Sequence, residues 1–427
     1  MILNRQNPPS IQPIGKYSIT EAKNHSLSNG IDLYAINAGN ESVLKLDIVF
    51  NAGIIHQNKK CQANFTAQLI SEGTTKYTAA EIAENLDFFG AYFQAKCNLD
   101  DSTITLYCLT KHLDNCLPYV IDVLNDAIFP EEDLSIHKKN SIQKLNVNEQ
   151  RNSFLVRRAF NQHIFGSDNA YGSFATETDI NTISREDLLS FYHNNYKNGI
   201  KYLLVSGLLA SDTVAIVQKY FDTDSFKPAG IKTIKYTPHK PQNENIFIEK
   251  SNSVQCSIRV GRKLFNRNHS DFREMQLLNL ILGGYFGSRL MKNIREEKGL
   301  TYGIYSALEA FQQDAVWYID TEMNNELVEL GVKEILKEIQ TLREIPVDEQ
   351  ELQIAKNYLL GSFLRNTEGP FNLADRFRIL KDYNLTYDYF YDFIEIIKNM
   401  KASQIKDLAN KYLNEKDLSI VIVGTKQ

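Results

Sequence analysis

The chain has 427 residues, 43% of them hydrophobic, and a formal net charge of −5. This length allows two or three domains with well-buried cores, and the near balance of 47 Lys and Arg against 52 Asp and Glu gives no basic footprint for nucleic acid. No apolar run approaches the roughly 18 residues that span a bilayer, and no basic segment leads into an apolar one at the start. We therefore expect a cytoplasmic protein, or a periplasmic one if a signal peptide was removed, with neither nucleic acid nor membrane as a partner.

The first half is predicted to combine strands and helices after a polar lead-in of about 30 residues. Residues 33–38 and 43–50 predict a hairpin around the Gly39-Asn40 turn. Thr78 and Glu81 have the spacing of a capping box, which begins a helix. The other elements predicted in this half are a helix over 62–71, strands within 91–109, long helices over 111–127 and 131–166, a helix over 184–195, a strand over 202–207 and a helix over 211–222.

The second half repeats this plan. Residues 223–244 contain Pro and Lys and lack periodicity, which predicts a linker between a first domain (1–222) and a second (245–427). Segments 183–207 and 403–424 are alike at an offset of about 215 residues, and so are the Phe129-Pro130 and Ile345-Pro346 regions. A duplication of this kind predicts two similar α+β domains. The elements predicted here are strands over 245–249, 253–260, 315–320 and 418–424, and helices over 271–282, 325–343, 347–366 and from about 403.

The stretch 294–302 (IREEKGLTY) is the most informative in the chain. Locally it predicts a helix that ends at Gly299, because glycine enters the left-handed region at low cost, followed by a strand. By this local pattern alone, Arg295 and Tyr302 would be ordinary surface or packing residues. Three nearby glycines lack the spacing of a nucleotide-binding loop and predict a break in a helix; they are Gly283, Gly284 and Gly287.

The SRL…REEKGLTY pattern resembles the arginine–tyrosine segment of the pitrilysin/insulinase family of zinc peptidases, which includes the mitochondrial processing peptidase. The resemblance extends over nearly the whole chain. It implies tandem α/β-roll domains, each with a mostly antiparallel sheet and helices on one face. In that family an Arg and a Tyr seven residues later come from the half without zinc and contact the substrate. The matching positions here are Arg295 and Tyr302.

The family also implies an HxxEH zinc motif on a helix of the first domain. Its two His bind the metal from one helix face, its Glu is the general base, and a Glu from a later helix is a further ligand. The matching segment, NFTAQLISEGT, has Asn64 and Gln68 at the ligand positions and Ala67 at the base position. The later ligand best matches Lys144, within an acid-free stretch. Amides are poor zinc ligands, alanine accepts no proton and lysine repels a cation, so we expect no metal and no cofactor in this chain.

These observations predict the non-catalytic subunit of a heterodimeric zinc endopeptidase that degrades or processes unfolded peptides. The chain would not be an enzyme on its own. A partner carrying HxxEH would hold the zinc, and Arg295 and Tyr302 would act on its substrate in trans. The alternative is an inactive peptide-binding or assembly scaffold, and a homodimer of the isolated chain also stays open. The aromatic run 387–393 is expected to serve core and interface packing rather than to line a peptide chamber.

Overall fold

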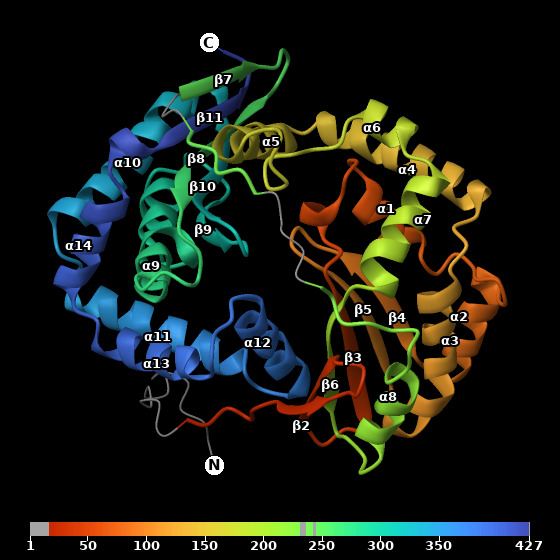
Figure 1. The fold of residues 1–427 in the computed structure, drawn as a ribbon. Helices are drawn as coiled ribbons and strands as arrows, with labels where there is room; N and C mark the ends of the chain where they lie inside the picture. Colours follow the sequence, from red (N-terminus) through yellow and green to blue (C-terminus); the bar gives the residue numbers. More distant parts are fainter. Residues whose placement is uncertain (1–16, 231–235, 242–244, 427) are drawn as a thin grey trace, which may run out of the picture.

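The computed structural model describes residues 17–230, 236–241 and 245–426, which form two similar halves (Figure 1). The predicted lead-in up to residue 16, and residues 231–235 and 242–244 of the predicted linker, lie outside the described residues. The first half contains a sheet of six strands in the order β1-β2-β6-β3-β5-β4, and the second a sheet of five in the order β7-β11-β8-β10-β9. The strands are β1 (Lys23–Ser26), β2 (Asp32–Asn37), β3 (Val43–Phe50), β4 (Tyr92–Cys97), β5 (Ser102–Leu109), β6 (Ile200–Gly207), β7 (Asn245–Glu249), β8 (Gln255–Leu264), β9 (Ile304–Ala310), β10 (Ala315–Asn324) and β11 (Ser419–Gly424).

Most strand pairs are antiparallel, but β2 pairs with β6 and β7 pairs with β11 in parallel. The first of these pairs corrects a prediction from the sequence. The hairpin expected from residues 33–38 and 43–50 is wrong, because β6 lies between β2 and β3, parallel to β2 and antiparallel to β3. Nearly every side chain of β6 is buried, so this strand needs a neighbour on both edges and cover on both faces. The alternating sequence pattern identified β2 and β3 as strands but carried no information about their partner.

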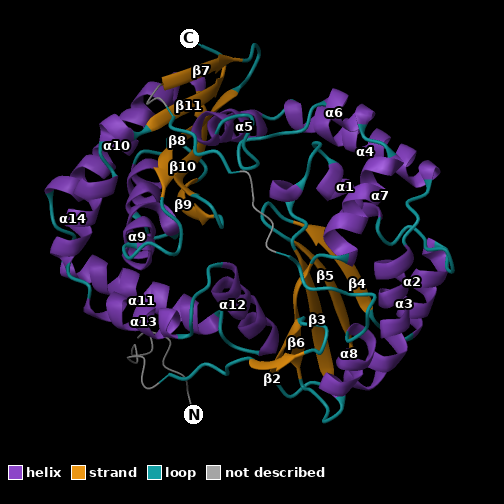
Figure 2. Cartoon of the chain, viewed as in Figure 1, coloured by secondary structure: helices purple, strands orange, loops and turns teal. Residues whose placement is uncertain are grey.

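Helices cover each sheet (Figure 2). Those of the first half are α1 (Gln62–Leu69), α2 (Ala79–Phe88), α3 (Leu113–Asp126), α4 (Glu131–Glu149), α5 (Asn152–Phe165), α6 (Glu177–Thr182), α7 (Arg185–Tyr192) and α8 (Thr213–Phe221). Those of the second half are α9 (Phe272–Asn279), α10 (Val328–Glu344), α11 (Glu349–Arg365), α12 (Pro370–Asp382), α13 (Asp388–Asn399) and α14 (Ala402–Tyr412). The capping box is confirmed: the Glu81 N–H donates to Thr78 Oγ1 at 3.3 Å, and the Thr78 N–H donates to the Glu81 carboxylate at 2.8 Å. No helix in the described ranges is long and apolar enough to cross a membrane.

The internal duplication is confirmed by the positions of corresponding elements. β5 ends at Leu109 and β10 ends at Asn324, 215 residues later. A single 3-10 turn follows each strand, and α3 and α10 then begin at Leu113 and Val328, at the same offset. The two halves therefore share a strand–turn–helix unit that can be compared residue by residue.

One helix from each half packs on the sheet of the other half. α5 lies against β8 and β11, and α12 lies against β2 and β6 (Figure 1). The single helix predicted over 131–166 is accordingly two helices, α4 and α5, because the chain turns at Gln150 and Arg151 to reach the second sheet. Phe160 of α5 joins Val316 and Tyr318 in one buried cluster, so each half needs the other to complete its core.

The contact of α12 with the first sheet combines aromatic and ionic groups. The Phe377 ring lies 4.7 Å from the Tyr34 ring, centroid to centroid. Buried Lys45 of β3 lies 3.0 Å from Asp375 of α12 and 3.0 Å from its strand neighbour Asp47. Lys45 and Asp47 are buried, whereas Asp375 is largely exposed, so the ion pair that reaches α12 lies at the edge of the contact. The division into domains at 223–244 stays a prediction.

The aromatic run 387–393 forms the first turns of α13. Three of its side chains are buried in the core of the second half; they are Tyr389, Phe390 and Phe393. This confirms the core part of the interpretation, and the interface part stays a prediction.

Candidate functional site

The residues at the degenerate zinc-motif positions gather around one cavity. Asn64, Ala67 and Gln68 lie at helical spacing on α1, and Asn64 and Gln68 line a cavity of about 710 Å³. Lys144 of α4 lines the same cavity. Ala67 is buried and does not line it. The fold therefore brings three of the four expected positions together.

The groups around this cavity do not fit a zinc ion. Asn64 and Gln68 offer neutral amides and Lys144 an ammonium, whereas zinc prefers imidazole, thiolate and carboxylate ligands. The described lining residues include one group of each preferred kind, the Cys61 thiol, the His137 imidazole and the Glu309 carboxylate at the end of β9. Within the described ranges, no group of three or more His, Cys, Asp or Glu side chains converges on a point that could hold a metal.

His137 of α4 also lines the cavity and was missed by sequence reasoning. Its ring packs edge-on against the Phe65 ring, with the centroids 4.4 Å apart, and its buried Nε2 has no hydrogen-bond partner among the residues that the structure describes. Burial, and secondarily the nearby Lys144 ammonium, lowers the pKa of His137. No spacing in the sequence distinguished this His from the others.

The remaining walls suit a peptide. Both halves contribute, because Glu309 and Phe311 of the second half join the first-half residues. The Arg157 guanidinium lies 5.7 Å from the centre of the Phe154 ring, which combines a cation with an apolar surface. Amide, cationic and aromatic groups can hydrogen-bond a peptide backbone, pair with its carboxylates and cover its apolar side chains. These are binding interactions, and none of them cleaves a peptide bond.

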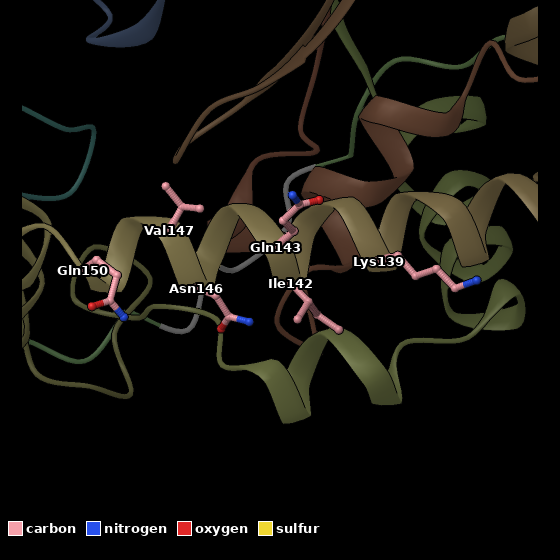
Figure 3. A pocket seen from close by; sticks show the side chains of 6 residues that line it. All are labelled: Lys139, Ile142, Gln143, Asn146, Val147 and Gln150. Carbon is pink, nitrogen blue, oxygen red and sulfur yellow. The ribbon is translucent and has the colours of Figure 1, made fainter.

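A second depression, of about 560 Å³, is formed by α4 alone (Figure 3). In this view Lys139, Ile142 and Asn146 point to one side of the helix and Val147 to the other. The six lining residues include no acid, His or Cys; they are Lys139, Ile142, Gln143, Asn146, Val147 and Gln150. The described residues that line this depression thus include no carboxylate, imidazole or thiol that could bind a metal.

Arg295 lies in the second half, in a widened helical turn, Met291–Glu297. The Lys298 N–H donates to the Asn293 carbonyl at 3.1 Å, and Gly299 then adopts a φ of +62°, which confirms the predicted helix end. The Asn293 side chain donates to Glu334 of α10 at 3.2 Å. This bond ties the turn to a long helix. Widened turns of this kind are frequent at functional sites.

The Arg295 guanidinium lies between two exposed aromatic rings. It is 4.9 Å from the centre of the Phe286 ring and 5.6 Å from that of Tyr302. Tyr302 is 92% exposed. Within the part of the chain that the structure describes, neither Arg295 nor the Tyr302 hydroxyl has an ion-pair or hydrogen-bond partner. The cation–π contacts therefore hold the two side chains together while leaving their polar donors available. Nothing in the sequence identified Phe286 as a contact of Arg295, apart from its position between Gly284 and Gly287.

A hydroxyl network fixes the backbone on both sides of Tyr302. Thr301 Oγ1 donates to the Glu322 carbonyl of β10 at 2.6 Å and accepts from the Gly303 N–H at 3.1 Å. Thr321 of β10 donates to the Gly303 carbonyl at 2.9 Å. Upstream, the backbone of Gly283 approaches β9 so closely that a Cβ there would lie 2.7 Å from the Ser306 nitrogen. The loop that presents Tyr302 is thus anchored to the sheet.

The Arg295–Tyr302 pair does not lie in the cavity at the degenerate zinc positions. Tyr302 precedes β9, whereas Glu309, near the far end of that strand, lines the cavity. Seven residues of strand correspond to about 23 Å, at roughly 3.3 Å per residue. The five predicted site residues with exposed or half-buried side chains thus form two groups: Asn64, Gln68 and Lys144 in one, and Arg295 and Tyr302 in the other.

Comparison with known proteins identifies relatives over most of the chain. The model of the insulinase family, peptidase family M16, matches residues 34–175, and that of the peptidase M16 inactive domain matches residues 182–359. An uncharacterized zinc protease of Rickettsia felis is 26% identical over 403 residues, which cover 93% of this chain and 96% of the relative. A non-peptidase homolog of Helicobacter pylori is 24% identical over 401 residues, which cover 90% of this chain and 89% of that protein.

Solved structures share the fold. The peptidase M16 inactive domain of Pseudomonas fluorescens superimposes with a TM-score of 0.85 at 24% identity, covering 95% of this chain and 98% of that one. A protease from Helicobacter pylori superimposes with a TM-score of 0.81 at 18% identity, covering 95% of this chain and all of that one (100%). The two models follow one another along the chain, over residues 34–175 and 182–359, and the chain belongs to the insulinase family of peptidases, M16.

Proposed function

We propose that this chain is the non-catalytic half of a two-chain zinc endopeptidase and that it contributes Arg295 and Tyr302 to the active site of its partner. The observation that carries the proposal is the exposed pair itself. The Tyr302 hydroxyl faces solvent beside a guanidinium that has no carboxylate partner among the described residues. A residue kept only for packing would not be 92% exposed on an anchored loop.

The two side chains would have separate roles. Tyr302 would donate its hydroxyl hydrogen to the carbonyl oxygen of the scissile peptide bond, where negative charge develops during hydrolysis. Arg295 would hold the peptide backbone with its planar set of donors and keep the Tyr302 ring in place. Thr301 is a positioning residue, since it touches the loop and not the peptide. The water-activating metal would be the partner's, because the groups around Asn64 and Gln68 do not suit zinc.

The cavity at the degenerate zinc positions would bind part of the same peptide. Its amide, cationic and aromatic walls support binding without cleavage. The partner would be an M16 subunit with an intact HxxEH motif and the substrates unfolded peptides. We keep the cytoplasm as the proposed compartment, with the periplasm as the alternative.

The test is reconstitution with the candidate HxxEH subunit and a quenched fluorescent peptide. Tyr302→Phe removes one hydrogen-bond donor and should lower kcat about 10²–10³-fold. Arg295→Lys keeps the charge but loses the donor fork, so it should raise KM as well as lower kcat. Tyr358→Phe is the matched control, since Tyr358 is an exposed tyrosine of the same half that stacks on Tyr285. A chelator should abolish all cleavage.

The scaffold alternative predicts a different pattern. If the pair cleaves peptides equally well with Tyr302→Phe and Arg295→Lys, the two residues do not contact the reacting bond. If the chain binds peptide but never increases cleavage by any HxxEH subunit, it is an inactive binding protein of the family.

A further inference from the structure

A groove on the second half lies apart from both groups of site residues. It has a volume of about 570 Å³ and is bounded by α10, β11 and β7. None of its lining residues is shared with the cavity near Asn64. Its apolar side chains come from two elements; they are Val328, Val332 and Leu336 of α10 and Ile420 and Ile422 of β11.

The first half has the same surface, and there it is covered by a helix. α8 packs on α3, the counterpart of α10, and its Val217 and Phe221 are fully buried. The Lys219 ammonium of α8 lies 2.8 Å from the Asp114 carboxylate of α3, and the Tyr220 hydroxyl donates to the Asp114 carbonyl at 3.1 Å. An amphipathic helix with one basic residue therefore closes this surface in the first half.

Corresponding positions differ in burial in the way that a missing cover would produce. Leu117 of α3 is fully buried, whereas Val332, 215 residues later on α10, is half-buried. Val205 lies two residues before the end of β6 and is fully buried, whereas Ile422, at the same place on β11, is half-buried. Covering large apolar side chains of this kind would lower the free energy, because it removes their apolar surface from water.

The neighbouring strand shows the same difference in burial, and the rim carries two acidic and two basic residues: Glu329, Glu415, Lys333 and Lys337. Val205 pairs with Ala35 in the same parallel register in which Ile422 pairs with Phe247. Ala35 is buried, but Phe247 is 38% exposed. The counterpart of Asp114 is Glu329, which lines the groove and has no cationic partner within the described ranges. The groove thus keeps the acidic group and the apolar surface that α8 satisfies in the first half.

We infer that this groove is the docking site for a short amphipathic helix of a partner protein, with a Lys or Arg facing Glu329 and apolar side chains over Val332 and Ile422. Its length would be close to the nine residues of α8. In this mode of docking, the side chains at positions i, i+3, i+4 and i+7 of the bound helix contact the groove. It is independent of the Arg295–Tyr302 proposal, because the groove can be occupied whether or not peptides are cleaved.

The probe is a blocked, fluorescein-labelled peptide with the sequence of residues 211–222 (SDTVAIVQKYFD), titrated into the full chain and followed by anisotropy. We expect saturable binding that weakens at least tenfold in Val332→Asp, because the new carboxylate would be buried without a partner. Leu330→Asp is the matched control: Leu330 is exposed on the same helix but outside the groove, and binding should not change. Circular dichroism checks that both variants are folded.

Charge exchange tests the orientation of the helix. Glu329→Lys should weaken the peptide several-fold, and a peptide with Lys219→Glu should recover most of that loss against the Glu329→Lys chain. Absence of saturable binding, or binding that Val332→Asp leaves unchanged, overturns the inference. A concentration-dependent dimer that Val332→Asp abolishes in sedimentation velocity would overturn it too, since the occupant would then be a second copy of this chain.

Discussion

Phe160→Ala tests whether the exchange of α5 and α12 makes the two halves one folding unit. Phe160 is on α5, in first-half sequence, yet it is fully buried against the second sheet. Its ring lies 6.3 Å from that of Tyr318 and 5.7 Å from the Arg259 guanidinium. Truncating a buried Phe costs about 3–5 kcal/mol, and the lost edge-to-face contact places this site in the upper part of that range. We expect the free energy of unfolding to fall by about 4–5 kcal/mol, because a site held between a helix and a sheet collapses little.

The assay is urea unfolding followed by two signals. The single tryptophan, Trp317, is buried in the second sheet and reports on that half by fluorescence, while far-ultraviolet circular dichroism reports on both. We expect the two midpoints to coincide in the parent chain and to move together in Phe160→Ala. Phe88→Ala is the control, because Phe88 is 83% exposed on α2 and its loss should change stability by less than about 0.5 kcal/mol. Fluorescence and dichroism midpoints that separate in the parent chain would refute the shared core.

Two further predictions concern local contacts. Burial acts to raise the pKa of Asp271, but hydrogen bonds from Lys411 and Tyr412 lower it to about 2. A carboxyl group whose pKa is lower in the folded than in the unfolded state stabilises the fold above pH ~4. That stabilisation is lost as the pH falls through about 2. Asp271→Asn should therefore cost about 1 kcal/mol at pH 7, reduced by the solvent exposure of Lys411, and a cost that persists at pH 2 in thermal unfolding would contradict the ion pair. Gly53→Ala would place a methyl carbon 2.3 Å from the Asp100 carbonyl carbon, which should cost about 1–3 kcal/mol. Gly361→Ala is the control, because no atom of the described residues lies within 4 Å of its added carbon, and equal unfolding midpoints for the two variants would contradict the close approach.

The sequence was most informative where the signal is local. The capping box at Thr78, the helix end at Gly299 and the 215-residue offset each follow from residue types at fixed spacing, and each is present in the structure. The poor fit of the Asn64 and Gln68 amides to zinc is also a local property, because it depends on the residue types at two positions of one helix. The pairing of β2 and β3 was wrong because β6, more than 150 residues away, takes the place between them.

The sequence by itself determined the duplicated α+β plan and the poor fit of Asn64, Ala67, Gln68 and Lys144 to a metal, and its motifs carried the resemblance to the family. Only the tertiary structure decided that α5 crosses to the other sheet, that the Arg295 guanidinium lies between two aromatic rings, and that α10 keeps an uncovered groove. The physical reason is that helix caps, turns and ligand spacings are set by neighbours a few residues apart. Burial and cover depend instead on which distant segment packs on a face, and two such faces can have the same local pattern.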